Sequence, residues 1–96
     1  MLGENHKRSR IEVMADILRL GEAGKTEIMF QANLSYIQLQ KYLRYLTEGG
    51  FLQRVVVPNP GVKFRITGKG EKLLNNIDVV LDMLEPPEQR GPGQPS

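Results

Sequence analysis

The chain has 96 residues, 40% of them hydrophobic and 25% charged, which is typical of one globular domain with a small core. It contains no cysteine and one histidine, His6, which excludes disulfides and thiolate metal sites, so we expect neither a metal nor any other cofactor. No apolar run approaches the ~20 residues of a membrane span, and the polar amino-terminal stretch has no secretory signal, so we expect a cytoplasmic protein.

The net charge of +2 is unevenly distributed along the chain. Residues 1–70 carry 11 Lys and Arg against 6 Asp and Glu, whereas residues 71–96 carry 2 against 5. A basic body with an acidic carboxyl-terminal segment is compatible with a polyanion-binding surface, and equally with chance scatter in a small protein. Residues 1–8 are polar and are expected to form a flexible basic arm.

Capping signals mark the beginning of the first helix. Ser9 followed by Glu12 fits a capping box, and the glycines of residues 21–25 end the helix. The apolar side chains that recur at helical spacing, and are therefore expected to face the core, are Ile11, Met14, Ala15 and Leu18. A short second helix is expected over residues 26–32, with Thr26 as its N-cap.

A sharp turn and a rigidly started third helix follow. Asn33 tolerates the left-handed backbone of a tight turn, and Ser35 with Gln38 forms a second capping box. The third helix is expected over residues 35–48, where two glycines stop it. Two helices joined by about three residues have the geometry of a helix-turn-helix.

Residues 51–66 predict a β-hairpin. The stretch 51–57 is rich in β-branched residues, and the two prolines of residues 58–61 require a turn because proline donates no ladder hydrogen bond. Residues 62–66 alternate between apolar and basic side chains, so we expect Phe64 and Ile66 to face inward and Lys63 and Arg65 to face outward.

The predicted order of elements is that of a mainly α winged helix-turn-helix with a β-hairpin wing. A further carboxyl-terminal helix, capped by Thr67, follows the hairpin. We therefore expect a flexible basic arm over residues 1–8, the winged helix-turn-helix over 9–66, a dimerisation helix over 67–85 and a disordered tail over 86–96.

The outer face of the third helix carries side chains suited to reading a DNA duplex. In a helix-turn-helix the second helix enters the major groove, where Gln38 could pair with adenine and Lys41 or Arg44 with guanine or phosphate. The candidate DNA-binding residues of this helix are Ser35, Tyr36, Ile37, Gln38, Lys41, Arg44 and Tyr45. The further candidates for phosphate contact are Arg54, Lys63 and Arg65 on the hairpin, Lys25 and Thr26 at the second helix, and Arg8 and Arg10 near the amino terminus. The alternative is an ordinary solvated face, with basic side chains protecting an edge strand.

The last helix is apolar over more of its circumference than one small domain can cover. Such a helix requires two partners, and we expect these to be its own domain and the same helix of a second chain. The candidate dimer-interface residues are Leu73, Ile77, Val80, Leu81, Met83 and Leu84. The alternative is that part of this apolar surface is simply exposed.

Three segments of the sequence resemble a known family. KTEIMFQANLSYIQLQKYLRYL, GGFL and FRITGKGEKLL are similar to the archaeal winged-helix family of small DNA-binding proteins, described as chromatin-associated proteins or predicted transcriptional regulators. The resemblance covers about residues 8–84. It implies DNA binding through the third helix and the wing, and homodimerisation through the last helix. Well-known members carry a long coiled-coil helix there, whereas Pro86 and Pro87 end this one early.

The function expected from these observations is double-stranded DNA binding, with residues 35–48 in the major groove and residues 51–66 on the backbone. The modest net charge favours a transcriptional regulator over an architectural chromatin protein, and a winged-helix module for protein–protein contact is the other alternative. We do not expect an enzyme. The sequence contains no paired carboxylates near a candidate base, no candidate nucleophile with its base, and no glycine-rich phosphate loop.

Overall fold

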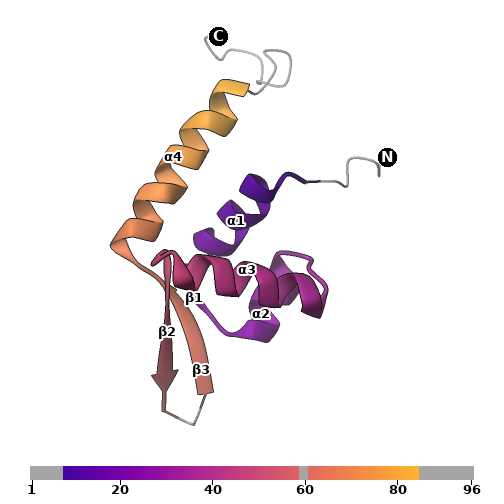
Figure 1. Ribbon diagram of the computed structural model, residues 1–96, viewed down its shortest axis with the longest axis vertical. Helices are drawn as coiled ribbons and strands as arrows, with labels where there is room; N and C mark the ends of the chain where they lie inside the picture. The colour runs from indigo at the N-terminus through magenta and orange to yellow at the C-terminus, as the bar shows by residue number, and fades with distance from the viewer. Residues whose placement is uncertain (1–7, 59–60, 85–96) are drawn as a thin grey trace, which may run out of the picture.

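The computed structural model describes residues 8–58 and 61–84, and its architecture confirms the predicted winged helix-turn-helix with an added helix (Figure 1). The elements are α1 (Arg10–Arg19), β1 (Glu22–Ala23), α2 (Lys25–Gln31), α3 (Tyr36–Glu48), β2 (Leu52–Val57), β3 (Gly61–Ile66) and α4 (Gly68–Leu84). The predictions for residues 1–7, which include His6, and for residues 86–96 lie outside the described residues.

Local capping chemistry sets the beginnings of α1 and α3. The Ser9 hydroxyl accepts from the Glu12 N–H at 3.1 Å, and the Glu12 carboxylate accepts from the Ser9 N–H at 2.8 Å. Ser35 and Gln38 make the same reciprocal pair at α3, with distances of 3.2 and 3.0 Å. Asn33 has a φ of 56°, so the left-handed turn between α2 and α3 lies where the sequence predicts it.

The beginning of α2 differs from the prediction. The helix begins at Lys25, so Thr26 is its second residue, and the N-cap is Gly24, which has no side chain to accept a hydrogen bond. The preceding β1 requires an extended chain up to Gly24, and this fixes the point at which the helix can begin.

Helix α1 is buried on a wider face than the predicted stripe. Its buried residues are Val13, Ala15, Ile17 and Leu18, whereas Ile11 is 42% exposed. The reason is that α1 packs against both α2 and α4, so two of its faces are covered, whereas the side that carries Ile11 is left open to solvent (Figure 1). Met14 is half-buried against the core.

The sheet contains a strand that sequence patterning did not reveal. β1 pairs with β3 in antiparallel fashion, Glu22 opposite Arg65 and Ala23 opposite Phe64, which gives the strand order β1-β3-β2. A strand of two residues is too short to show the alternation of apolar and polar side chains by which strands are recognised in a sequence. Of these two residues only Ala23 is buried, and its side chain is a single methyl group. The hairpin itself is confirmed, and β3 buries Phe64 while Lys63 is exposed.

A seam of hydrogen bonds joins the end of α3 to the beginning of α4. The Thr67 hydroxyl donates to the Gly50 carbonyl at 2.6 Å and accepts from the Gly70 N–H at 3.0 Å, which confirms Thr67 as the cap. The Lys69 ammonium donates to the Gly49 carbonyl at 2.8 Å and lies 4.9 Å from the centre of the Phe51 ring. This cation therefore stabilises the carboxyl end of α3, where the helix dipole is negative.

Candidate nucleic-acid interface

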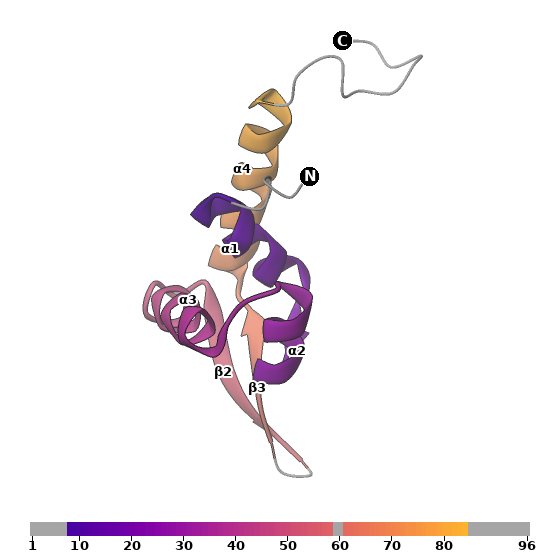
Figure 2. The same ribbon diagram turned by 90° about the vertical axis from the view of Figure 1, so that its right-hand side faces the viewer.

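Helix α3 lies on the outside of the molecule with one face anchored in the core (Figure 2). Leu39, Leu43 and Leu46 are buried on its inner face. On its outer face Ile37 is 68% exposed and Tyr45 is 60% exposed. A face that only contacts solvent rarely carries several large apolar side chains, so this surface is suited to meeting a partner.

The exposed polar residues of α3 are spread along this outer face. Lys41 and Arg44 are both exposed, and Tyr36 is 58% exposed in the first turn. Gln40, which was not among the predicted residues, is exposed beside Arg44, and the two side chains line the same hollow. Its position three residues after Ile37 and four before Arg44 places it on the same side of the helix, and that spacing could have identified it.

The capping box limits what Ser35 and Gln38 can do. The Gln38 amide oxygen accepts from the Ser35 N–H, and the Ser35 hydroxyl accepts from the Gln38 N–H. A bidentate pair with adenine requires both the amide oxygen and the amide NH₂ of glutamine. With the capping box intact, Gln38 therefore has only its NH₂ group for a base or a phosphate.

Basic side chains from α2 and the hairpin meet at a hollow of about 550 Å³, here called the wing hollow. It is lined by Gly24, Lys25, Thr26, Glu27, Arg54, Val62 and Lys63. Lys25 also lines a neighbouring hollow with Gln40, Arg44 and Glu48, so a surface on which cations outnumber carboxylates continues from the wing onto α3. The fold thus brings together cationic residues that are far apart in the sequence, a geometry suited to tracking a phosphate backbone.

Two predicted phosphate ligands are held by other groups of the chain. The Arg8 guanidinium bonds to the Asp16 carboxylate and to the Ala32 carbonyl, so Arg8 does not behave as part of a free arm. The Arg65 Nε atom lies 2.7 Å from a carboxylate oxygen of Glu22, its partner across the β1–β3 pair. Both arginines therefore offer less uncompensated charge to a phosphate than their sequence positions indicate.

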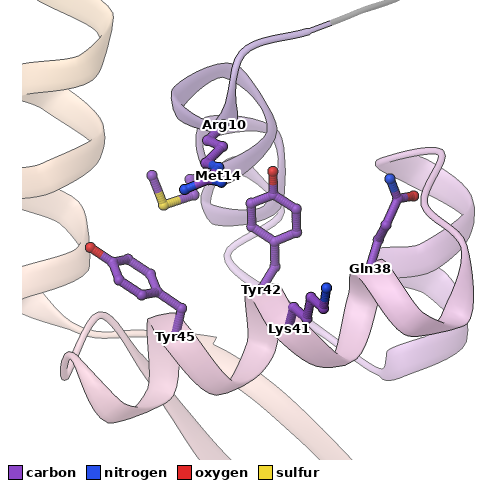
Figure 3. A pocket seen from close by; sticks show the side chains of 6 residues that line it. All are labelled: Arg10, Met14, Gln38, Lys41, Tyr42 and Tyr45. Atoms are coloured by element: carbon purple, nitrogen blue, oxygen red, sulfur yellow. The ribbon is translucent and has the colours of Figure 1, made fainter.

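Arg10 takes part in a different arrangement, a groove between α1 and α3 (Figure 3). This groove, here called the tyrosine groove, has a volume of about 470 Å³. It is lined by Arg10, Met14, Gln38, Lys41, Tyr42 and Tyr45. The Tyr42 ring stands on α3, points toward α1 and is half-buried against the core.

Comparison with known proteins identifies the family. The model of the winged helix-turn-helix family matches residues 7–85, which include every described helix and strand. The chain belongs to the winged helix-turn-helix family.

Similar proteins come from archaea. The uncharacterized protein MJ0287 of Methanocaldococcus jannaschii is 33% identical over 82 residues, covering 82% of this chain and 79% of that protein. A second protein of the same organism, the uncharacterized MJ0290, is 34% identical over 83 residues, but this chain spans only 37% of its length. The crystal structure of Sso10a-2, a DNA-binding protein from Sulfolobus solfataricus, superimposes with a TM-score of 0.72 at 31% identity, covering 79% of this chain and 81% of that one.

Helix α4 is the addition to the winged helix-turn-helix, and its apolar side chains divide into two sets. Ile77 is buried within the chain, and Leu73 packs against the core. The apolar residues that face away are Val79, Val80, Met83 and Leu84, which are 58%, 44%, 74% and 72% exposed. Leu81 is half-buried. Of the predicted interface residues, Ile77 is thus already buried within the chain and Leu73 and Leu81 are half-buried, so the exposed apolar surface lies toward the end of α4.

Phe30 on α2 was not predicted as a surface feature and is 82% exposed. Its neighbours Ile28 and Ala32 are buried, so the helical phase of α2 directs Phe30 outward, and this phase could have been read from the sequence. Among the residues described, no three His, Cys, Asp or Glu side chains are grouped to hold a metal ion, and no helix is long and apolar enough to cross a membrane.

Proposed function

We propose that this winged helix-turn-helix protein binds double-stranded DNA, with α3 in the major groove and the β2–β3 hairpin on the backbone. The observation that carries the proposal is the continuous basic surface from the wing hollow to the outer face of α3. Its uncompensated cations are Lys25, Lys41, Arg44, Arg54 and Lys63, none of which has an ion-pair partner within residues 8–58 and 61–84. The similarity to Sso10a-2, whose structure is that of a DNA-binding protein, supports the same assignment.

Within this proposal each part of the surface has a distinct role. Lys41 and Arg44 lie where a reading helix meets base edges and the adjoining phosphates. The exposed rings and methyl groups of Tyr36, Ile37 and Tyr45 can contact thymine methyl groups and sugars. The wing hollow holds a phosphate of the flanking backbone, which positions the protein but carries no sequence information.

The test is a fluorescence-anisotropy titration of a labelled duplex at several salt concentrations. Binding through phosphates predicts an affinity that falls steeply as salt rises. The double variant Lys41→Glu and Arg44→Glu should abolish measurable binding. Lys41→Glu alone should also weaken binding, whereas Lys72→Glu, which reverses one exposed charge on α4, is its control and should retain most of the wild-type affinity. Wild-type affinity in the double variant would show that α3 does not contact the duplex.

We further propose that the protein acts as a transcriptional regulator in the cytoplasm rather than as an architectural coat on DNA. The modest net charge of +2 supports this choice, because sequence-independent coating depends on an abundance of Lys and Arg. Selection of bound duplexes from a random pool tests it. Enrichment of a motif supports a regulator, whereas binding without enrichment supports the architectural role.

The exposed end of α4 supports a homodimer, which would hold two reading helices at a fixed separation. Val79, Met83 and Leu84 form an apolar surface that water covers in a single chain. Sedimentation equilibrium should show a dimer at micromolar concentration, and Met83→Glu should shift the protein toward the monomer. A wild-type monomer at high micromolar concentration would contradict dimerisation through α4.

A further inference from the structure

The tyrosine groove lies on the α1 side of α3, away from the wing hollow, and has the size of a small-molecule site (Figure 3). Its volume of about 470 Å³ lies within the range of about 300–1,000 Å³ found for ligand pockets. Tyr42, Tyr45 and Met14 give it apolar and aromatic walls. Flat rings and a thioether are surfaces on which another planar ring can stack.

Two cations line the same groove. Arg10 reaches the groove from the first turn of α1, and Lys41 borders it on α3. Neither has an ion-pair partner among the residues that the structure describes. Two uncompensated positive charges match a phosphate monoester, which carries about −1.5 to −2 charges at pH 7, better than they match a single carboxylate.

The remaining lining residue offers a hydrogen-bond donor. The Gln38 amide NH₂ is the part of that side chain which the capping box leaves available. An amide donor can bond the edge of a heterocyclic base while the ring stacks on tyrosine. A ring, a donor-matched edge and a doubly charged group together describe a nucleotide.

We propose that the tyrosine groove binds a free nucleoside monophosphate, with the base against Tyr42 and Tyr45 and the phosphate bound by Arg10 or Lys41. Because Lys41 and Tyr45 also belong to the proposed DNA-reading surface, the bound nucleotide competes with DNA for them. This competition rests on the proposed DNA binding, whereas nucleotide binding itself does not. The ligand would therefore act as an effector that releases the protein from DNA.

Isothermal titration calorimetry of the full chain with AMP, UMP, adenosine and inorganic phosphate tests the binding. At least one of the two nucleotides should bind, and adenosine and phosphate alone should each bind at least about tenfold more weakly, since each lacks half of the recognition. Amide shifts in ¹⁵N-labelled protein should concentrate on residues of the tyrosine groove. No heat from either nucleotide at millimolar concentration, or shifts confined to the wing hollow, would overturn the proposal.

Exposed side chains allow the site to be altered without disturbing the core. Arg10→Gln should weaken nucleotide binding by about tenfold, because a hydrogen bond to a charged group is lost. Tyr45→Ala should weaken it by about fivefold or more through the loss of stacking. Lys72→Gln removes one exposed positive charge from α4, outside both proposed sites, and should bind the nucleotide like the wild type. Equal affinities in all these variants would show that the groove is not the site.

The coupling is measured separately by repeating the DNA titration with saturating nucleotide. Saturation should weaken DNA binding at least about tenfold, because both ligands require the same two side chains. Unchanged DNA affinity would refute the competition and leave the nucleotide site standing. A protein that binds no DNA at all would refute the proposed function, while the calorimetric result would still decide the nucleotide site.

Discussion

The seam between α3 and α4 depends on Gly70, and Gly70→Ala should break it. A Cβ at this position would lie 2.2 Å from the Phe51 carbonyl oxygen and 2.8 Å from Cγ1 of Ile66. The Phe51 carbonyl cannot easily move aside, because it accepts a hydrogen bond from the Thr67 N–H at 3.1 Å. The first turn of α4 must therefore shift away from the hairpin and lose seam hydrogen bonds.

The size of this effect follows from two contributions. Overpacking of a well-filled site costs about 1–3 kcal/mol, and each lost hydrogen bond adds about 1 kcal/mol. Together they lower the free energy of unfolding by about 2–4 kcal/mol, a large part of the roughly 5–15 kcal/mol that stabilises a typical domain. For a chain of this size, Tm should fall by more than about 10 °C.

Gly68→Ala is the matched control for Gly70→Ala. Both glycines lie in the first turn of α4 and neither has a positive φ, but a Cβ at Gly68 has no atom within 4 Å. Alanine is the better helix former by up to about 1 kcal/mol, so Gly68→Ala should leave stability unchanged or raise it slightly. Urea denaturation followed by circular dichroism measures both variants. Equal stabilities of the two variants would refute the argument from close packing at Gly70.

Further predictions concern the reading helix, the wing and the core. Ser35→Ala should lower the free energy of unfolding by about 1 kcal/mol in urea denaturation, and Ser35→Asp should restore the cap while weakening DNA binding through repulsion of phosphate. Lys63→Gln should reduce the slope of log affinity against log salt by about 0.9, whereas Arg65→Gln should change it less, because Glu22 already compensates Arg65; equal changes would contradict that difference. In urea denaturation Ile28→Ala should cost about 2–5 kcal/mol, and Phe30→Ala should stay within about 0.5 kcal/mol of the wild type, since only Ile28 is buried.

The features predicted correctly from the sequence are those determined by neighbours along the chain. A capping box needs only a hydroxyl and a Glu or Gln three residues later, so Ser9 and Ser35 identify the beginnings of α1 and α3. Asn33 adopts its left-handed backbone because of its own short polar side chain. The alternation that buries Phe64 and exposes Lys63 follows from the geometry of a single strand.

The features that were missed depend on partners distant in the sequence. Glu22 and Arg65 are 43 residues apart, and their ion pair exists only because β1 adds to the edge of the hairpin. Arg8 is similarly held by Ala32, 24 residues away. Ile11 follows the helical spacing of a core residue, but the tertiary arrangement leaves its side chain 42% exposed. Periodicity identifies a face that could be buried, and only the tertiary arrangement decides whether anything covers it.

Helix α1 connects the two surfaces for which we propose functions. On one side α1 packs against α4, where Ile77 is buried and Arg19 forms an ion pair with Asp78, while Val79 and Met83 face away from the domain. On the other side Arg10 and Met14 form one wall of the tyrosine groove, and α3 forms the opposite wall. A ligand that changed the spacing of α1 and α3 would therefore act on the one helix that also positions the proposed dimer surface. In a dimer, such a shift would change the separation of the two reading helices as well as the availability of Lys41.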